Sequence, residues 1–260
     1  MNLVRLMLDK GAKEFHSAIC GAAFRGYIDI VKLFLEKGVP DCNHCLRVAA
    51  EGGHMEIVNL MLDQGAIDFE TAMTYAAKGG HLDIFNLMLG KGVSKFSNAL
   101  IYSGYGGNLE IVQLLLDRVD YPPALKTVLS NAANSGHINI VKFMLEKGVT
   151  QLDDAMDRAS RNGHLEVVKL LLDKGVKVFN SSLEEAIIKG HVDIVKLMLD
   201  KGADKLDKPM YVSLARKDME LVKILLEKGA KSVNIDRAKE IRKGYFTFDE
   251  YLVEINSMTT

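Results

Sequence analysis

The sequence predicts an all-α solenoid, in which short antiparallel helix pairs stack one after another along the chain. Three observations support this prediction. Glycine recurs every 27 residues along most of the chain, each 27-residue unit divides into two short amphipathic segments, and charged residues recur at fixed places in those segments. A constant interval of this length indicates repeats that bury their apolar faces against neighbouring repeats.

The recurring glycines form two series. The first series ends each unit and consists of Gly11, Gly38, Gly65, Gly92, Gly148, Gly175, Gly202 and Gly229. The second series divides each unit and consists of Gly26, Gly53, Gly80, Gly107, Gly136, Gly163 and Gly190, with Lys217 in the same register. The step from Gly92 to Gly148 is 56 residues, or 27 plus 29, and we expect residues 121–123 to be a loop insertion that contains the two additional residues.

Each unit is expected to contain two helices of different character. In the first helix, for example residues 69–78, apolar residues follow a helical spacing and many of them are small, which lets a neighbouring helix approach closely. They are Phe69, Ala72, Met73, Ala76 and Ala77. The second helix, for example residues 165–174, is more apolar and ends at Gly175 in the position of a C-terminal cap. Neither helix would be stable alone in water, so the pairs must stabilise one another.

The predicted solenoid occupies residues 1–260 as a single domain. Residues 1–11 form half a repeat that has only a second helix, residues 12–229 form eight repeats, and residues 230–260 form a degenerate C-terminal capping repeat. In that last repeat, residues 244–252 bring polar side chains into the usual apolar helix, as a terminal repeat requires. The half repeat is either an N-terminal cap or the end of a longer array.

Charged residues recur at both ends of the second helix. Acidic residues lie near its start: Asp29, Glu56, Asp83, Glu110, Glu166, Asp193 and Glu220. Lysines lie at its end: Lys37, Lys91, Lys147, Lys174, Lys201 and Lys228. This arrangement complements the helix dipole, at about 0.3–1 kcal/mol for each charge. These columns are therefore interpreted as helix stabilisers rather than as a binding surface.

The second helices resemble those of a known repeat family. Residues 163–176 are similar to the second half of an ankyrin repeat, and residues 76–81, Ala-Ala-Lys-Gly-Gly-His, are similar to its inter-helix turn. The usual ankyrin unit has about 33 residues and begins with Thr-Pro-Leu-His. The present unit has 27 and lacks that motif, so the β-turn fingers of the family should be reduced to tight connections. Abbreviated arrays of this kind resemble ankyrin proteins of giant DNA viruses.

Composition disfavours several functional classes. The chain has 33 basic and 34 acidic residues, which is not the basic excess of a nucleic-acid-binding protein. No apolar run approaches the roughly 18 residues of a membrane helix. Three cysteines do not form a disulfide framework and are typical of a reducing compartment. We expect a cytoplasmic monomer, located in a host cell if the source is viral.

Two groups of residues contain the side-chain types of a metal site. His54, His81, His137, His164 and His191 occupy one column, whose place is taken by Tyr27, Asn108 and Asp218 in other units. Helix pairs stack about 8–10 Å apart, whereas two ligands of one zinc ion lie within about 4 Å. Neighbouring histidines therefore cannot share a metal ion, and we expect them to form hydrogen bonds in the turns.

Cys42 and Cys45 form a C-x-x-C motif, but they align with Phe69 and Ala72, which are expected core positions. We interpret them as core thiols. The alternative is a zinc site completed by His16 and Cys20 of the preceding repeat, which metal analysis of the purified protein would identify.

No residues indicate catalysis. The glycine-rich stretch 104–107 lies at an inter-helix turn rather than after a strand, so it does not match a phosphate-binding loop. No set of serine, histidine and aspartate recurs outside the repeat register. We therefore expect no catalytic residue, no cofactor and no enzymatic activity.

Two columns of the first helix vary from repeat to repeat, and we expect them to bind a partner protein. In the ankyrin family the variable positions before the inter-helix turn line a concave groove, so the resemblance implies contact there. The expected binding residues are Phe24, Arg25, Arg47, Tyr75, Lys78, Tyr102, Tyr105, Arg158, Arg161 and Ile188. Exposed aromatic residues and arginines are the types enriched at interface hot spots. The alternative is a structural ankyrin segment of a larger multidomain effector or adaptor.

Overall fold

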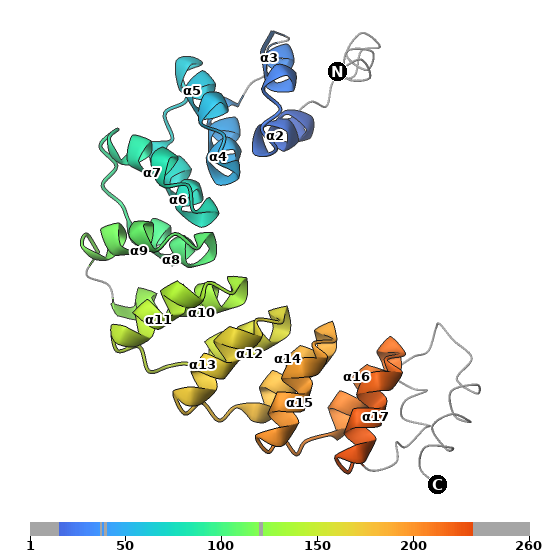
Figure 1. Cartoon of the computed structure of the whole chain (residues 1–260). Helices are drawn as coiled ribbons and strands as arrows, with labels where there is room; N and C mark the ends of the chain where they lie inside the picture. The colour runs from blue at the N-terminus through green and yellow to red at the C-terminus, as the bar shows by residue number, and fades with distance from the viewer. Residues whose placement is uncertain (1–15, 37, 39–40, 120–121, 231–260) are drawn as a thin grey trace, which may run out of the picture. The chain divides into compact units, whose positions relative to one another are not determined.

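The computed structural model describes residues 16–36, 38, 41–119 and 122–230. These residues form sixteen α-helices and no β-strand, which confirms the predicted all-α helical repeat solenoid (Figure 1). The chain divides into two compact parts of several repeats each, which we call unit 1 (residues 1–151) and unit 2 (residues 152–260). The predicted half repeat at 1–11 and nearly all of the predicted cap at 230–260 lie outside the described residues.

The helices alternate between the first and the second helix of a repeat. Unit 1 contains α2 (His16–Phe24), α3 (Ile28–Glu36), α4 (Cys42–Gly52), α5 (Met55–Asp63), α6 (Phe69–Gly79), α7 (Leu82–Leu89), α8 (Ser97–Gly106), α9 (Leu109–Leu116), α10 (Pro122–Ser135) and α11 (Ile138–Glu146). Unit 2 contains α12 (Asp153–Asn162), α13 (Leu165–Asp173), α14 (Phe179–Lys189), α15 (Val192–Asp200), α16 (Asp207–Arg216) and α17 (Met219–Glu227).

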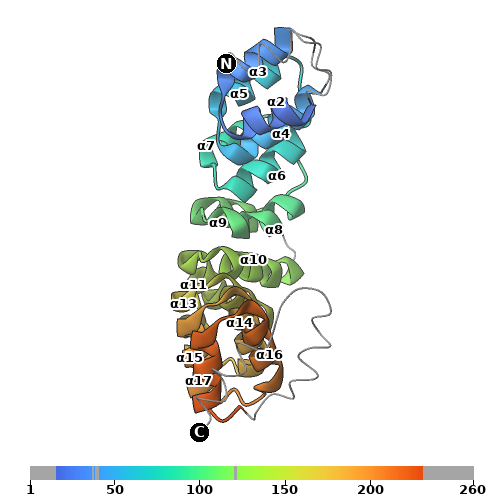
Figure 2. The ribbon, with the colours of Figure 1, turned by 90° about the vertical axis from the view of Figure 1, so that its right-hand side faces the viewer.

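Within each unit the first helices pack side by side in one layer. In unit 1 this layer consists of α2, α4, α6, α8 and α10, and each of these helices also packs against the second helix of its own repeat (Figures 1 and 2). In unit 2 the corresponding layer consists of α12, α14 and α16. The first helices therefore carry the variable columns on a continuous side of each unit.

The core lies between the two helices of each repeat. In α6 the small residues Ala72, Ala76 and Ala77 are buried, as predicted, and Phe69 is half-buried. The second helix α7 contributes larger side chains, including the fully buried Phe85. The connections between repeats contain no strand in the residues that the structure describes, such as 64–68, which agrees with the predicted loss of the fingers.

Both glycine series adopt the left-handed conformation that the cap prediction requires. The φ angles are 82–103° for the described members of the series that ends each unit, and 74–81° for the series that divides each unit. Lys217 adopts the same conformation with φ of 59°. Glycine has no side chain to oppose a positive φ, whereas lysine does. Both helices of a repeat thus end at positions that the sequence identifies.

The predicted loop insertion at residues 121–123 is wrong for its two prolines. Pro122 and Pro123 begin α10, which has 14 residues, whereas the other first helices have 9–11. Proline is tolerated in the first turn of a helix because the N–H that it lacks has no helical acceptor there. The insertion therefore lengthens a helix, and residue 121 lies outside the described residues.

The acidic column lies in the first turn of the second helices, as predicted. The lysine column lies just after the last helical residue rather than within the last turn. Glu56 and Glu166 lie in the first turns of α5 and α13. Lys174 and Lys201 follow the last residues of α13 and α15 and are C-cap residues. In the described part of the chain, no helix has both the length and the apolar character needed to cross a membrane.

Candidate binding surface

Histidines of four inter-helix turns connect their repeat to the one before it. The Nε2 atoms of four of them lie within hydrogen-bond distance of a carbonyl oxygen: His54 to Phe24 at 2.9 Å, His81 to Glu51 at 3.0 Å, His137 to Tyr105 at 2.8 Å, and His191 to Arg161 at 3.0 Å. The prediction that these histidines form hydrogen bonds in the turns is confirmed for these four. Three of the four acceptors belong to residues expected to bind a partner, so the histidines hold the backbone of the candidate surface.

A second feature of unit 1 is a set of glycines that allows adjacent repeats to approach closely. A Cβ atom on Gly52, Gly79 or Gly106 would lie 2.2 Å from a carbonyl oxygen of the preceding repeat. The corresponding residues of unit 2 are Asn162, Lys189 and Arg216, which carry long side chains. The ends of α4, α6 and α8 in unit 1 are therefore in contact through their backbones.

Arg47, Tyr75, Tyr102 and Tyr105 form a continuous series of contacts across α4, α6 and α8, which we call the aromatic row. The Arg47 guanidinium carbon lies 4.6 Å from the ring centre of Tyr75. Tyr75 and Tyr102 stack with ring centres 6.2 Å apart and planes 19° apart. Tyr102 and Tyr105 follow at 6.3 Å and 37°. Such distances are typical of favourable aromatic and cation–π contacts.

The aromatic row remains accessible although its members contact one another. Tyr102 is 37 % exposed, and Arg47, Tyr75 and Tyr105 are half-buried. Phe24, in the same register column as Tyr105, is 46 % exposed. The rings therefore pack against neighbouring repeats and also present apolar surface to solvent.

Lysine and glutamate flank the aromatic row. The Lys78 ammonium nitrogen lies 5.3 Å from the Tyr75 ring centre and 2.6 Å from a carboxylate oxygen of Glu51. Arg47 donates from Nη2 to the ring of His44, with Nη2 3.0 Å from Nε2. No carboxylate of the described residues forms an ion pair with Arg47 or with the exposed Arg25.

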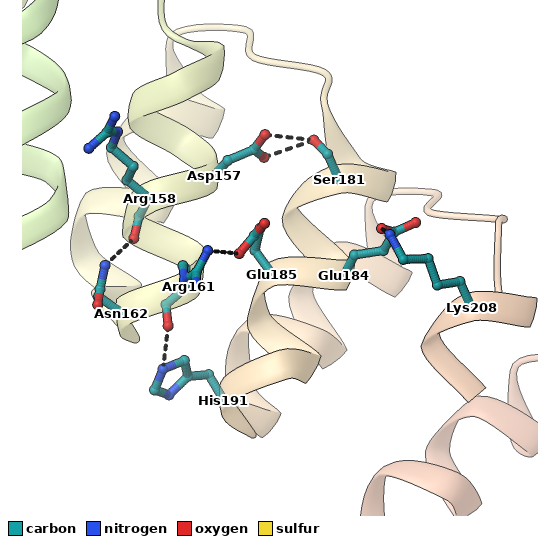
Figure 3. Close-up of polar contacts among 9 residues, drawn as sticks. All are labelled: Asp157, Arg158, Arg161, Asn162, Ser181, Glu184, Glu185, His191 and Lys208. Atoms are coloured by element: carbon teal, nitrogen blue, oxygen red, sulfur yellow. Dashed lines mark hydrogen bonds and ion pairs between the residues drawn. The ribbon is translucent and has the colours of Figure 1, made fainter. Parts of the chain in front are cut away.

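In unit 2 the predicted binding arginines are already paired with carboxylates. Arg158 Nε lies 2.9 Å from an oxygen of Asp154. Arg161 Nη1 lies 3.4 Å from an oxygen of Glu185, as Figure 3 shows. On the next helix, Lys208 is paired with Glu184. The structure thus places Arg158 and Arg161 on adjacent turns of α12, within an ion-paired surface.

Ile188, the remaining predicted residue of unit 2, is half-buried on α14. Its carbonyl oxygen accepts a hydrogen bond from Arg216 Nη1 at 2.6 Å. The carbonyl oxygen of Ile188 is equivalent to those that contact histidine in other repeats, and here Arg216 takes the place of the histidine. The side chain of Ile188 forms no part of the aromatic row.

Sequence reasoning missed the polar contacts around Asp157. The hydroxyl groups of Ser181 and Ser182 both donate to Asp157, each at 2.8 Å. Burial raises the pKa of Asp157, and the two hydroxyl groups oppose that increase. A sequence signal existed for several such contacts: Asp157 and Ser181, Arg161 and Glu185, and Glu184 and Lys208 are all 24 residues apart. This spacing is one repeat minus one helical turn.

The cysteines lie together between α2 and α4. Cys45 is buried, Cys20 and Cys42 are half-buried, and all three are free thiols. Burial raises the pKa of Cys45 to about 12 and also raises the pKa of Cys20 above its ordinary value. The described residues contain no group of three side chains that could hold a metal ion, and the side chain of His16 lies outside them.

Comparison with known proteins addresses the family of the chain. A family model described as ankyrin repeats (3 copies) matches residues 19–99, 46–124, 73–154, 100–182 and 158–237. No protein with a curated description matches the chain. The five overlapping matches extend over residues 19–237, which is more than half of the chain. The chain therefore belongs to the ankyrin-repeat family.

Proposed function

We propose that the chain is a scaffold that binds a partner protein, and that the aromatic row of unit 1 is the centre of the binding surface. Ankyrin repeats generally mediate protein–protein interaction. The observation that carries the proposal is the row itself, in which partly exposed tyrosines of neighbouring repeats are stacked beside an arginine. Tyrosine and arginine are enriched among the residues that dominate binding energy.

The packing of the row favours binding for a second reason. Each ring is held by its neighbours before a partner arrives, so little side-chain entropy is lost when the partner binds. The His137 hydrogen bond and the close approach at Gly106 also hold the backbone next to Tyr105. A preorganised apolar surface of this kind is expected to bind more tightly than the same residues on a mobile loop.

The other predicted residues contribute to different degrees in this proposal. Phe24 and Arg25 extend the surface towards α2, and Lys78 lies beside Tyr75. Arg158 and Arg161 contribute less, because a partner would have to replace contacts that these arginines already make with Asp154 and Glu185. Truncating an already paired arginine therefore removes little of the binding energy.

The test is a quantitative pull-down from the lysate of the source, followed by affinity measurement with the captured protein. We expect the triple variant Tyr75→Ala, Tyr102→Ala and Tyr105→Ala to bind at least about 30-fold more weakly, the effect of losing a hot spot of ~2 kcal/mol. The matched control is Arg158→Ala with Arg161→Ala, which should keep affinity within about threefold. Full affinity of the triple variant, with an unchanged circular dichroism spectrum, would disprove the proposal.

We further propose a cellular setting for this activity. All three cysteines are free thiols. Free thiols are typical of proteins in a reducing compartment such as the cytoplasm, so they support that location. The abbreviated repeat, which resembles giant-virus ankyrin proteins, supports a viral source and a partner from the host cell. In this setting the chain acts as a monomer, and sedimentation of the purified protein tests that assignment.

A further inference from the structure

The proposed binding surface has a local charge that the whole chain does not have. Although the chain has a formal charge of −1, the described first helices of unit 1 contain two carboxylates, Glu51 and Glu70. Both are paired, with Lys78 and with Lys95 respectively. α2 and α8 contain no charged residue at all, and α10 contains a single lysine. The N-cap carboxylates Asp41 and Asp68 accept hydrogen bonds from backbone N–H groups at the starts of α4 and α6. Among the described residues, neither Arg25 nor Arg47 forms an ion pair with a carboxylate.

Unit 2 provides an internal comparison. Its first helices contain six carboxylates, at Asp153, Asp154, Asp157, Glu184, Glu185 and Asp207, against five lysines and arginines. Arg158, Arg161 and Lys208 are paired with carboxylates of this layer, and Figure 3 shows the pairs of Arg161 and Lys208. A charged partner would gain little there, because existing ion pairs would have to be exchanged for new ones. The first helices of unit 1 carry three lysines and arginines against two carboxylates, whereas those of unit 2 carry five against six, so the positive balance belongs to unit 1.

Arg47 is placed to contact a partner at the edge of the aromatic row. Its guanidinium lies over one face of the Tyr75 ring, and a single nitrogen is used in the contact with His44. A guanidinium has five N–H donors, so donors remain for a carboxylate, which it binds in a planar, two-point geometry. Arg25 is exposed at the end of α2 and provides a second such group. Arg47 therefore borders the tyrosine rings on the α4 side, and Arg25 lies one helix farther along the layer, at the end of α2.

Building on the proposed function, we propose that the partner presents an acidic segment of polypeptide to unit 1, in which aspartate or glutamate residues lie on one side of an apolar or aromatic side chain. The apolar side chain covers Tyr75 and Tyr102, and the carboxylates pair with Arg47 and Arg25. Charge complementarity of this kind selects against basic segments and accelerates association with acidic ones. A nucleic acid fits less well, because affinity for nucleic acid depends on the number of phosphates neutralised, and Arg25 and Arg47 would neutralise only about two.

The experiment is selection of peptides from a random 12-residue phage library by the full-length protein. Peptides are retained if they bind the wild-type chain and lose binding to the tyrosine triple variant. We expect these peptides to be enriched in aspartate and glutamate next to aromatic or leucine residues. For a selected peptide, Arg47→Gln should weaken binding roughly tenfold, as loss of a charged hydrogen bond does, and should reduce its salt dependence.

Two further variants separate charge from folding. Arg25→Gln changes an exposed side chain outside the row and should also weaken binding, by about threefold. Lys208→Gln, the control in unit 2, should leave binding unchanged because that lysine is already paired with Glu184 and is not part of the proposed surface.

The outcomes distinguish the two proposals. Selected peptides that depend on the tyrosines but have neutral or basic composition would overturn the acidic partner and leave the proposed function intact. Selected peptides that bind the triple variant equally well would overturn both. Tight binding of a single-stranded 12-nucleotide probe that Arg47→Gln abolishes, without acidic peptides, would replace the acidic polypeptide with a nucleic acid.

Discussion

Gly79 shows how one absent side chain sets the distance between neighbouring repeats. It is the last residue of α6, where alanine would favour the helix more than glycine does. A Cβ atom there would lie 2.2 Å from the carbonyl oxygen of Glu51, and the obstacle is backbone, which cannot rotate away. At Gly21 in α2, a Cβ atom would meet nothing within 4 Å. Position 79 therefore has no room for a Cβ atom, whereas position 21 has, although both glycines lie in helices.

The first prediction compares alanine at these two positions. Gly79→Ala should lower the free energy of unfolding by about 1–3 kcal/mol, the usual cost of overpacking. Gly21→Ala should leave it unchanged or raise it by up to about 1 kcal/mol, because alanine is the better helix former. Urea denaturation followed by circular dichroism measures both. A Gly79→Ala variant as stable as the wild type would contradict the close approach of α4 and α6.

The second prediction concerns the buried thiol of Cys45. Burial raises its pKa from 9.0 to about 12, so the folded chain keeps this proton at a pH where the unfolded chain releases it. The stabilisation is therefore complete below about pH 9 and is lost progressively as the pH rises towards about 12. In urea denaturation under reducing conditions, the stability advantage of the wild type over Cys45→Ala should shrink between about pH 8 and about pH 10.5. A constant difference would show that the thiol titrates normally in the folded state.

The residue that caps the C-terminus of the first helix is not glycine in every repeat. The C-cap of α16 is Lys217, which has φ of 59°, whereas glycine occupies this place in the seven described turns before it. A side chain in the left-handed region costs about 1–2 kcal/mol, offset in part by the lower entropy of a non-glycine residue in the unfolded chain. The third repeat of unit 2 therefore ends its first helix at a conformational cost.

The third prediction is that Lys217→Gly stabilises the chain. The free energy of unfolding should rise by up to about 1 kcal/mol, because glycine adopts a positive φ without strain. Gly65→Ala is the matched control: its φ is 87° and nothing lies within 4 Å of the added Cβ, so its loss of stability reports conformation alone. Thermal and urea denaturation measure both variants. A less stable Lys217→Gly would mean that the lysine side chain contributes more than the strain costs.

The fourth prediction concerns the hydrogen bond between adjacent repeats. His81→Ala should lower the free energy of unfolding by about 1 kcal/mol, the usual value of one hydrogen bond. His81→Asn should lose less, because Asn108 in the corresponding place donates to the Gly80 carbonyl oxygen at 3.3 Å and also accepts from the N–H groups of Glu110 and Ile111. Equal losses in the two variants would show that the imidazole acts by packing rather than by hydrogen bonding.

The bounds of the helices could be predicted from the sequence better than the side-chain contacts on the candidate surface. The 27-residue interval and the two glycine series identify where helices end, because a positive φ at a helix end requires glycine in nearly every case. The start of α10 was missed because Pro122 and Pro123 are read equally well as a turn or as a first helical turn. Local residue preference does not distinguish these two possibilities.

The register also predicted which columns face the candidate surface, but not what each side chain does there. Tyr75 of unit 1 and Arg158 of unit 2 occupy equivalent places three repeats apart, yet one stacks in the aromatic row and the other pairs with Asp154. The difference depends on neighbours in the adjacent helix or on the next turn. Pairs 24 residues apart, such as Arg161 and Glu185, carry that information in the sequence; the stacking of Tyr102 and the burial of Cys45 require the packed structure.

Across the molecule, the extensive helix contacts join elements that are next or next but one in chain order. Stability in such an array is approximately a sum of terms for single repeats and for interfaces between neighbours. A change at one repeat is felt by its neighbours and fades beyond them. Gly79 in unit 1 and Lys217 in unit 2 share no neighbouring helix in this scheme.

The fifth prediction follows from this arrangement and uses the two variants already described. The double variant Gly79→Ala with Lys217→Gly should have a free energy of unfolding equal to the sum of the single effects, with a coupling below about 0.5 kcal/mol. Urea denaturation of the wild type, both single variants and the double variant gives the coupling directly. Gly79→Ala with His81→Ala is the contrasting pair, because both changes affect the contact of one repeat with Glu51 and should couple by more than about 0.5 kcal/mol. If the distant pair coupled as strongly as the adjacent one, stability would be shared along the whole chain, and nearest-neighbour contacts would not account for it.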